Sequence, residues 1–171
     1  MTTLIPPAYG EDKHLFNKSE AHLEETIVYG KATKKVGIAS SSSEGLVALA
    51  DFNTRPILRI GELAEMLPGM VATQHSGEGK ANQYFLRGMN LDHGTDFSMW
   101  VEGMPINLRA HAHGQGYLDL NFIIPELVES ARYSKGPYKA SNGDFSSAGN
   151  SSISLYESIP QPLISVTLGT E

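Results

Sequence analysis

The chain has 171 residues, of which 40% are hydrophobic, and a formal net charge of -6 at pH 7. This length accommodates one domain with a modest core and a tail. The negative charge argues against a nucleic-acid partner, because neutralising phosphates takes clustered Lys and Arg side chains. Cysteine is absent, which excludes a disulfide framework, a thiolate zinc site and a thiol nucleophile.

The first fifty residues are largely polar and are interrupted by proline and glycine, so we expect residues 1–50 to form a flexible tail. The serine tract at residues 40–45 is part of that expectation. Residues 24–30 differ from their surroundings, because consecutive strand formers stand there between acids and a glycine. They predict an unpaired strand, and a β-prone patch in a random tail is the alternative.

The beginning of the sequence lacks the basic segment and apolar run of a secretory signal peptide. No apolar stretch approaches the roughly 20 residues that a membrane-spanning helix needs. If the protein acts outside the cytoplasm, we expect a signal peptide to have been removed or replaced.

Ordered structure is predicted for residues 51–160, beginning with a short amphipathic helix. Asn53 or Thr54 can cap this helix, and Pro56 fits its first turn. Pro68 and Gly69 end the helical pattern. The apolar residues that recur at helical spacing are Ile57, Ile60, Leu63, Ala64 and Leu67.

Strands are predicted where strand formers occur together or apolar and polar residues alternate, at 83–87, 99–102, 104–107, 127–133 and 152–156. Glycine-rich loops separate them, at 74–80, 90–95, 109–117 and 141–150. This pattern indicates an α+β domain: a small mixed sheet of four to five strands, two or three short helices and long loops. Residues 161–171 predict a linker and the start of another strand, because Ile164, Val166 and Leu168 alternate with smaller residues.

No catalytic motif is complete. Residues 77–81 are similar to a phosphate-binding loop, but Gln74 stands where the loop needs glycine and Ala81 where it needs Ser or Thr. The sequence also lacks a Gly-x-Ser-x-Gly elbow and a Ser-x-x-Lys motif. We therefore expect no enzyme activity, no catalytic residue, no resident metal and no cofactor.

Five short motifs follow one another in the part predicted to be ordered. They are Leu-Pro-Gly at 67–69, Leu-Arg-Gly at 86–88, Val-Glu-Gly-Met-Pro at 101–105, Pro-Glu-Leu-Val-Glu at 125–129 and Lys-Gly-Pro at 135–137. Their order and spacing resemble the plug domain of the TonB-dependent outer-membrane receptors, over residues 53–157. Three positions depart from the family pattern: Glu102 replaces Asp, Arg132 replaces Glu, and residues 150–152 replace a glycine pair.

The resemblance implies that the strand predicted in the tail is a TonB box. The periplasmic domain of TonB, the energy-coupling protein, would grip this segment by adding a strand. The residues expected to bind TonB are Glu25, Thr26, Ile27, Val28 and Tyr29. The plug would fill a C-terminal barrel in the outer membrane, with the tail in the periplasm, and would meet the membrane only through that barrel.

The resemblance also implies charge contacts between plug and barrel. Arg87 and Lys135 match cationic positions that pair with carboxylates of the barrel wall, and Glu129 is the acidic counterpart. Buried charges of this kind are costly unless they are paired. For Lys135, an exposed position at a strand end is an equal alternative.

The resemblance also implies that three loops face the ligand, at residues 74–79, 90–96 and 108–117. His111 and His113 project the same way if their loop is extended, and His75 or His93 could join them around a metal or metal chelate. No spacing here is a zinc signature, so hydrogen bonding or packing is the alternative. The residues expected to face the ligand are Gln74, His75, His93, Arg109, His111, His113, Gln115 and Tyr117.

The function that this resemblance implies is gated, energy-coupled uptake of a scarce nutrient: a siderophore, metal chelate, cobalamin or carbohydrate. The alternative is a barrel-less periplasmic or secreted binding module with a plug-like fold. The two differ in whether the parent gene continues past Glu171 into amphipathic strands of the length that barrels need.

Overall fold

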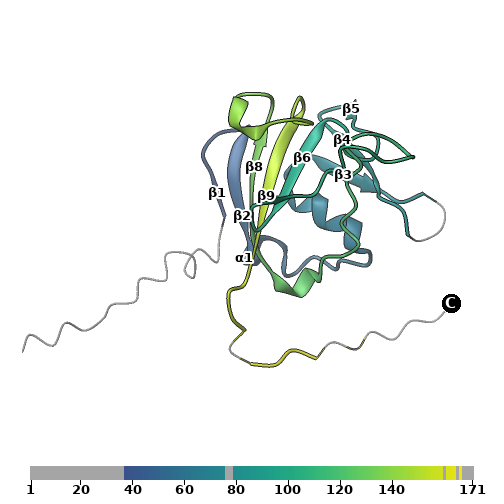
Figure 1. Ribbon diagram of the computed structural model, residues 1–171. Coiled ribbons are helices and arrows are strands. Elements are labelled where there is room, and N and C mark those ends of the chain that lie inside the picture. Colours follow the sequence, from purple (N-terminus) through teal and green to yellow (C-terminus); the bar gives the residue numbers. More distant parts are fainter. Residues whose placement is uncertain (1–36, 76–78, 160, 165, 167–171) are drawn as a thin grey trace, which may run out of the picture. The chain divides into compact units, whose positions relative to one another are not determined.

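A computed structural model describes residues 37–75, 79–159, 161–164 and 166. They form a mixed six-stranded sheet in the spatial order β1-β2-β8-β9-β6-β7 (Figure 1). The strands are β1 (Ile38–Ala39), β2 (Glu44–Ala48), β6 (Phe97–Val101), β7 (Met104–Pro105), β8 (Val128–Lys135) and β9 (Gly149–Leu155). β6 and β9 run parallel, and the other neighbouring strands are antiparallel.

A second, antiparallel sheet contains β3 (Met70–Thr73), β4 (Gln83–Leu86) and β5 (Met89–Asn90), and it lies beside the larger sheet in Figure 1. The helical segments are α1 (Leu49–Phe52) and three 3-10 helices, η1 (Ile60–Met66), η2 (Pro125–Leu127) and η3 (Ala140–Asn142). The predicted α+β class with short helices and long loops is therefore confirmed. The strands are more numerous than expected, because β1, β2, β3 and β5 also pair.

The helix predicted after Asn53 begins later and is a 3-10 helix. The Glu62 carboxylate accepts hydrogen bonds from the N–H groups of Leu58 (3.1 Å) and Arg59 (3.4 Å), so it holds the chain just before η1. Leu63 and Leu67 are buried as the spacing predicted. The apolar period therefore identified the buried face but not the type of helix.

The serine tract at 40–45 is ordered, contrary to the expectation of a flexible segment. The Ser41 hydroxyl accepts hydrogen bonds from the N–H groups of Ser43 and Glu44, both at 3.1 Å. These bonds form the turn that joins β1 to β2. The Ser41 hydroxyl therefore serves as the acceptor for two backbone N–H groups of the turn. A polar composition does not mean disorder at this position.

A β-bulge between Val128 and Ser130 changes the face assignment of β8. Strict alternation would place Val128 and Ala131 on opposite faces, but both are fully buried. Glu129 occupies the irregular position and is half-buried. Alternation of apolar and polar residues therefore located this strand, but the bulge decides which side chains are buried at its start.

Two of the sequence motifs are two-residue hairpin turns. Arg87 and Gly88, between β4 and β5, have φ of 52° and 79°. Glu102 and Gly103, between β6 and β7, have φ of 48° and 79°. Two consecutive positive φ values define the type I′ turn that suits twisted antiparallel strands, and glycine adopts them at little cost.

One core joins the two sheets and η1. Its fully buried members include Leu63 from η1, Tyr84 from β4, and Phe97, Met99 and Ile153 from the central strands. Burial raises the pKa of the Tyr84 hydroxyl, and Asp119 adds to the effect. Within the described part of the chain, no helix has the length and hydropathy that crossing a membrane requires.

We predict that Gly103→Ala lowers the free energy of unfolding by about 1–2 kcal/mol, because alanine at positive φ is strained. Gly114→Ala is the matched control: both glycines have open space where a methyl group would be added, but Gly114 does not have a positive φ. Urea denaturation of the two variants measures the difference. Equal stability of both variants would contradict the assignment of turn strain.

Candidate functional site

Three of the predicted motifs meet at the end of β8. The Lys135 ammonium donates a hydrogen bond to the Pro68 carbonyl at 2.8 Å, and its backbone N–H donates to the Ser43 carbonyl at 2.8 Å. The Arg87 guanidinium donates to the Ser43 hydroxyl at 2.9 Å and to the Ser42 carbonyl at 3.3 Å. We call Arg87 and Lys135 the cationic corner. It fastens the β1–β2 turn to both sheets.

The cationic corner contains two positive charges and no carboxylate. Lys135 is only 7% exposed. Burial lowers its pKa, and the positive charge of Arg87 lowers it further. The Lys135 ammonium lies 5.2 Å from the centroid of the Tyr133 ring, which offers a weak attraction. No salt bridge between residues that the structure describes involves either cation.

Glu129, expected with these cations, lies at the opposite end of β8. At about 3.3 Å per residue, six residues of strand separate it from Lys135 by roughly 20 Å. Its charge instead acts on Tyr156, whose pKa is raised first by burial and then by Glu129. The fold therefore brings together two of the three residues expected to contact the barrel wall.

Asn107 organises the loops that were expected to face a ligand. Its side-chain nitrogen lies 3.0 Å from each of three carbonyl oxygens, those of Gly94, Phe97 and Gly116. Its side-chain oxygen accepts the Met99 N–H at 2.8 Å. One amide thus joins the 90–95 and 109–117 loops to β6. The role of Asn107 is not predictable from the sequence, because a single asparagine after a strand carries no periodic or spacing signal.

Tyr117 supports these loops from inside. It is buried, and its hydroxyl accepts the Ala81 N–H at 2.7 Å. The following residue, Leu118, donates its N–H to the His93 carbonyl at 2.7 Å. Tyr117 was expected at the ligand surface, and the structure places it beneath that surface as the residue that ties the 109–117 loop to the segment before β4.

Three histidine rings lie around Tyr117 and a fourth lies beside one of them, and we call these residues, His75, His93, His111 and His113, the histidine cluster. Ring centroids are 4.4 Å apart for His93 and His113 and 5.1 Å apart for His75 and His93. His111 stacks on Tyr117 at 4.0 Å. His93 is buried, and the other three are exposed. Within the described residues, no three His, Asp or Glu side chains already form a metal-binding group.

The remaining expected ligand residues are more scattered. Arg109 is exposed, and its Nη1 lies 3.1 Å from the Asp144 carboxylate, which links the 109–117 loop to the loop before β9. Gln115 is exposed, and Gln74 is half-buried. The predicted loops therefore converge on the histidine cluster. Arg109, Gln115 and Gln74 are not part of that cluster.

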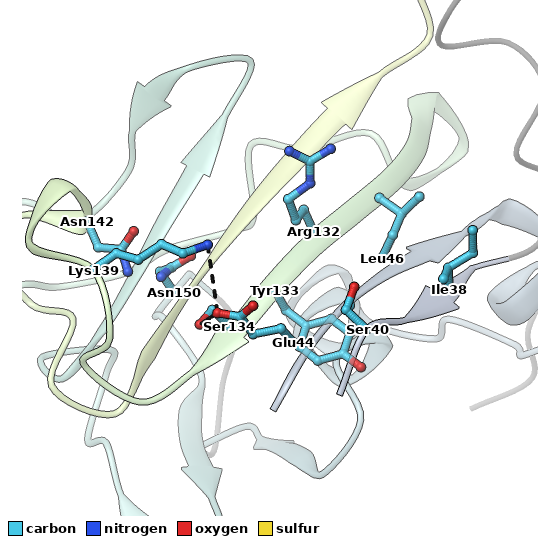
Figure 2. Close-up of a pocket in the computed structure, with 11 residues that line it drawn as sticks. Ile38, Ser40, Glu44, Leu46, Arg132, Tyr133, Ser134, Lys139, Asn142 and Asn150 are labelled. Atoms are coloured by element: carbon cyan, nitrogen blue, oxygen red, sulfur yellow. Dashed lines mark hydrogen bonds and ion pairs between the residues drawn. The ribbon is translucent and has the colours of Figure 1, made fainter. Parts of the chain in front are cut away.

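A separate cavity of about 420 Å³ lies against β1, β2, β8 and η3. Figure 2 shows Lys139, Asn142 and Asn150 at one end and Ile38 and Leu46 at the other. The Glu44 carboxylate accepts a hydrogen bond from the Ser134 hydroxyl at 3.1 Å and lies 3.7 Å from the Lys139 ammonium. None of the residues predicted to face a ligand lines this cavity.

The five residues expected to bind TonB, Glu25 to Tyr29, lie outside the described residues. The predicted final strand lies only partly within them, because Leu168 is also outside. Ile164 and Val166 are exposed.

The family pattern of the TonB-dependent receptor plug domain matches residues 37–150. This match covers more than half of the chain, begins at the strands found before residue 50, and includes the cationic corner and the histidine cluster. The chain belongs to the TonB-dependent receptor plug domain family.

Solved structures agree with this fold. The siderophore receptor PirA from Acinetobacter baumannii matches 68% of the chain with 24% identity and a TM-score of 0.51. A mutant of the ferric enterobactin receptor PfeA from Pseudomonas aeruginosa matches 68% with 21% identity and a TM-score of 0.51. The copper transporter OprC matches 71% with 18% identity and a TM-score of 0.52. The matched region is 18% of the length of each of these proteins.

We predict that Asn107→Ala lowers the free energy of unfolding by about 1–3 kcal/mol, because it leaves buried backbone groups without partners. Asn121→Ala is the matched control, since the Asn121 amide is exposed and bonds the Asp119 side chain and the Lys80 carbonyl. Denaturant unfolding gives both stabilities. Amide hydrogen exchange in the 90–95 and 109–117 loops should accelerate only in Asn107→Ala, and unchanged exchange there would contradict the role assigned to Asn107.

Proposed function

We propose that the chain is the plug of an outer-membrane receptor that takes up a scarce small-molecule nutrient with energy supplied through TonB. The plug closes a surrounding barrel of the same polypeptide, ligand contacts the histidine cluster from outside, and the tail reaches the periplasm. The protein transports its ligand and does not transform it.

The cationic corner is the observation that carries this proposal. Two positive charges, one of them buried, lie side by side, and their hydrogen-bond partners among the described residues are neutral groups. Such an arrangement costs free energy in an isolated domain and is stabilised when carboxylates approach from outside. A barrel wall that presents Asp or Glu to Arg87 and Lys135 supplies them.

A signal from the ligand must reach the tail, and the fold offers a short route. Asn107 ties the ligand loops to β6, whose parallel neighbour β9 pairs with β8. β8 pairs with β2, and β2 pairs with β1, which has only two residues at the edge of the sheet. The Asp51 carboxylate accepts the N–H groups of Gly37 (2.7 Å) and Ala48 (2.9 Å), so it anchors the point where the tail joins the domain.

The cargo class follows from the loops. The solved structures with this fold are named for siderophores, ferric enterobactin and copper. Exposed imidazoles, the Arg109 guanidinium and the Gln115 amide provide polar and metal-directed contacts of the kind that such ligands need. Loops of the barrel complete the site, so the plug alone binds its nutrient weakly.

We predict that a peptide of residues 24–31 binds the periplasmic domain of TonB by adding a strand. Ile27→Pro removes a backbone donor and should weaken binding at least about tenfold, since proline disrupts strand pairing. Isothermal calorimetry measures both peptides, and Thr26→Ser, which keeps the backbone donor, is the control. Equal affinity of the proline peptide would argue against strand addition and against this partner.

We predict that Arg87→Gln raises the pKa of Lys135 in this chain, because it removes the neighbouring positive charge. A lowered folded-state pKa means that the unfolded chain binds more protons, so stability rises as the pH climbs from the pKa of Lys135 toward the ordinary lysine value. This rise should shrink in Arg87→Gln. Carbon-detected NMR titration of the lysine side chains measures the pKa.

Arg109→Gln is the control for this titration, since Arg109 is exposed and already paired with Asp144. An unchanged Lys135 pKa in Arg87→Gln would contradict the electrostatic coupling. In the intact receptor, Arg87→Gln should loosen the plug, detected as faster hydrogen exchange in β8. Unaltered exchange there would count against pairing with the barrel wall.

A further inference from the structure

We propose that the cargo contacted by the histidine cluster is a transition-metal ion such as Cu²⁺ or Zn²⁺, or a chelate of such a metal with an open coordination position, and that His93 is its principal protein ligand. This inference rests on the proposed function, because it names the chemistry of the same ligand-facing loops. The observation behind it is one buried imidazole.

The tautomer of His93 is set by its partners. Its Nδ1 lies 2.9 Å from the Ala81 carbonyl oxygen and 3.2 Å from that of Asn82. Carbonyl oxygens only accept hydrogen bonds, so Nδ1 carries the proton and Nε2 of the neutral ring presents a lone pair. A backbone carbonyl on one ring nitrogen, with the other left free, is the arrangement that orients histidines for metal binding.

The Nε2 of His93 has no hydrogen bond among the described residues, although the residue is only 5% exposed. The neighbour of Nε2 among charged side chains is the carboxylate of Asp92, which is exposed. The imidazole is therefore held at Nδ1 by backbone carbonyls, and its Nε2 lies on the side of the exposed Asp92 carboxylate. Because packing already orders this side chain, binding costs less conformational entropy than it would at a flexible surface histidine.

Further ligands stand next to that nitrogen. The Asp92 Oδ1 lies 3.7 Å from His93 Nε2. This separation can be spanned by a metal with bonds of about 2.0–2.2 Å to nitrogen and oxygen. Asp92 has φ of 48°, a left-handed value that aspartate adopts more often than most other residues except glycine. Exposed His113 and His75 follow at 4.4 Å and 5.1 Å between ring centroids.

The composition of the site selects the metal. Imidazole with carboxylate suits Zn²⁺, Cu²⁺ and Ni²⁺, whereas thiolate ligands are excluded because the chain has no cysteine. No three of these groups already converge in the described residues. The plug therefore contributes one fixed imidazole and nearby side chains that can turn toward the metal, and water, a chelator or another loop completes the coordination. A chelate whose own donors fill every position has no place for His93.

The experiment titrates this chain with Cu²⁺ and with Zn²⁺, in a background carrying His14→Ala and His22→Ala, which removes the two histidines outside the cluster. His93→Asn is the decisive variant, because its amide can still donate to the Ala81 carbonyl while the ring nitrogen Nε2 is gone. We expect its metal affinity to fall at least about tenfold, as loss of an oriented ligand predicts. His113→Ala should produce a smaller loss.

His111→Ala is the matched control. The His111 Nδ1 accepts the His113 N–H at 3.2 Å, so its other nitrogen carries the proton and offers no lone pair. We expect less than a twofold change in affinity. A strong effect of His111→Ala together with no effect of His93→Asn would show adventitious chelation by an exposed loop and would overturn the proposal.

A second measurement uses the unmodified chain, so its result does not depend on whether a variant folds. Long-range proton–nitrogen NMR reads each imidazole nitrogen, and Zn²⁺ should shift the His93 Nε2 signal while Nδ1 stays protonated. An unmoved His93 signal at saturating Zn²⁺ would overturn the proposal. The proposed transport role is judged separately by the TonB peptide: binding of that peptide with no metal at His93 would reject only the cargo class.

Discussion

The rest of this structure depends on two like charges held at one place. Lys135 closes β8 against the Leu-Pro-Gly turn, and Arg87 fastens the β1–β2 turn from the neighbouring sheet. Their hydrogen bonds join elements that are distant in sequence. Burial lowers the pKa of Lys135, and the positive charge of Arg87 lowers it further. Under the proposed function, carboxylates of a barrel wall would stabilise this pair of charges from outside the domain.

The family motifs acquire physical meaning in this arrangement. The Arg-Gly and Glu-Gly pairs are I′ turns that end hairpins, and each also places a charged side chain. Glu102, which replaces the usual aspartate, accepts the Leu155 N–H at 2.5 Å and so reaches the end of β9. The backbone N–H of Glu102 donates to the Ile153 carbonyl at 3.0 Å, so the carboxylate makes a second hydrogen bond between the turn and β9. The departure from the family pattern thus preserves the hairpin and adds a tie across the sheet.

The loops expected to face the ligand are hydrogen-bonded at their base and carry exposed side chains above it. Asn107 and Tyr117 hold their backbones from below, and His93 is fixed between the two. His75, His113 and Gln115 are exposed above this base. In the function proposed here, a ligand would meet one preformed contact while other side chains adjust, and Asn107 would connect that contact to β6.

The sequence by itself determined the family, the α+β class, most long strands and the loops that gather the histidines. Those features are local: turn glycines, alternation and motif spacing operate over a few residues, so they can be recognised without coordinates. The family resemblance also singled out Arg87 and Lys135, as residues expected to pair with carboxylates of a barrel wall. Only the tertiary structure decided which polar residues have structural roles. The serine tract is ordered because Lys135 and Arg87, more than forty residues away in the chain, bind its backbone and hydroxyl groups. Glu129 is separated from the cations by the length of β8, and Tyr117 is buried because its hydroxyl finds the Ala81 N–H. These outcomes depend on long-range partners, and a polar side chain carries no sequence signal of which distant group will satisfy it.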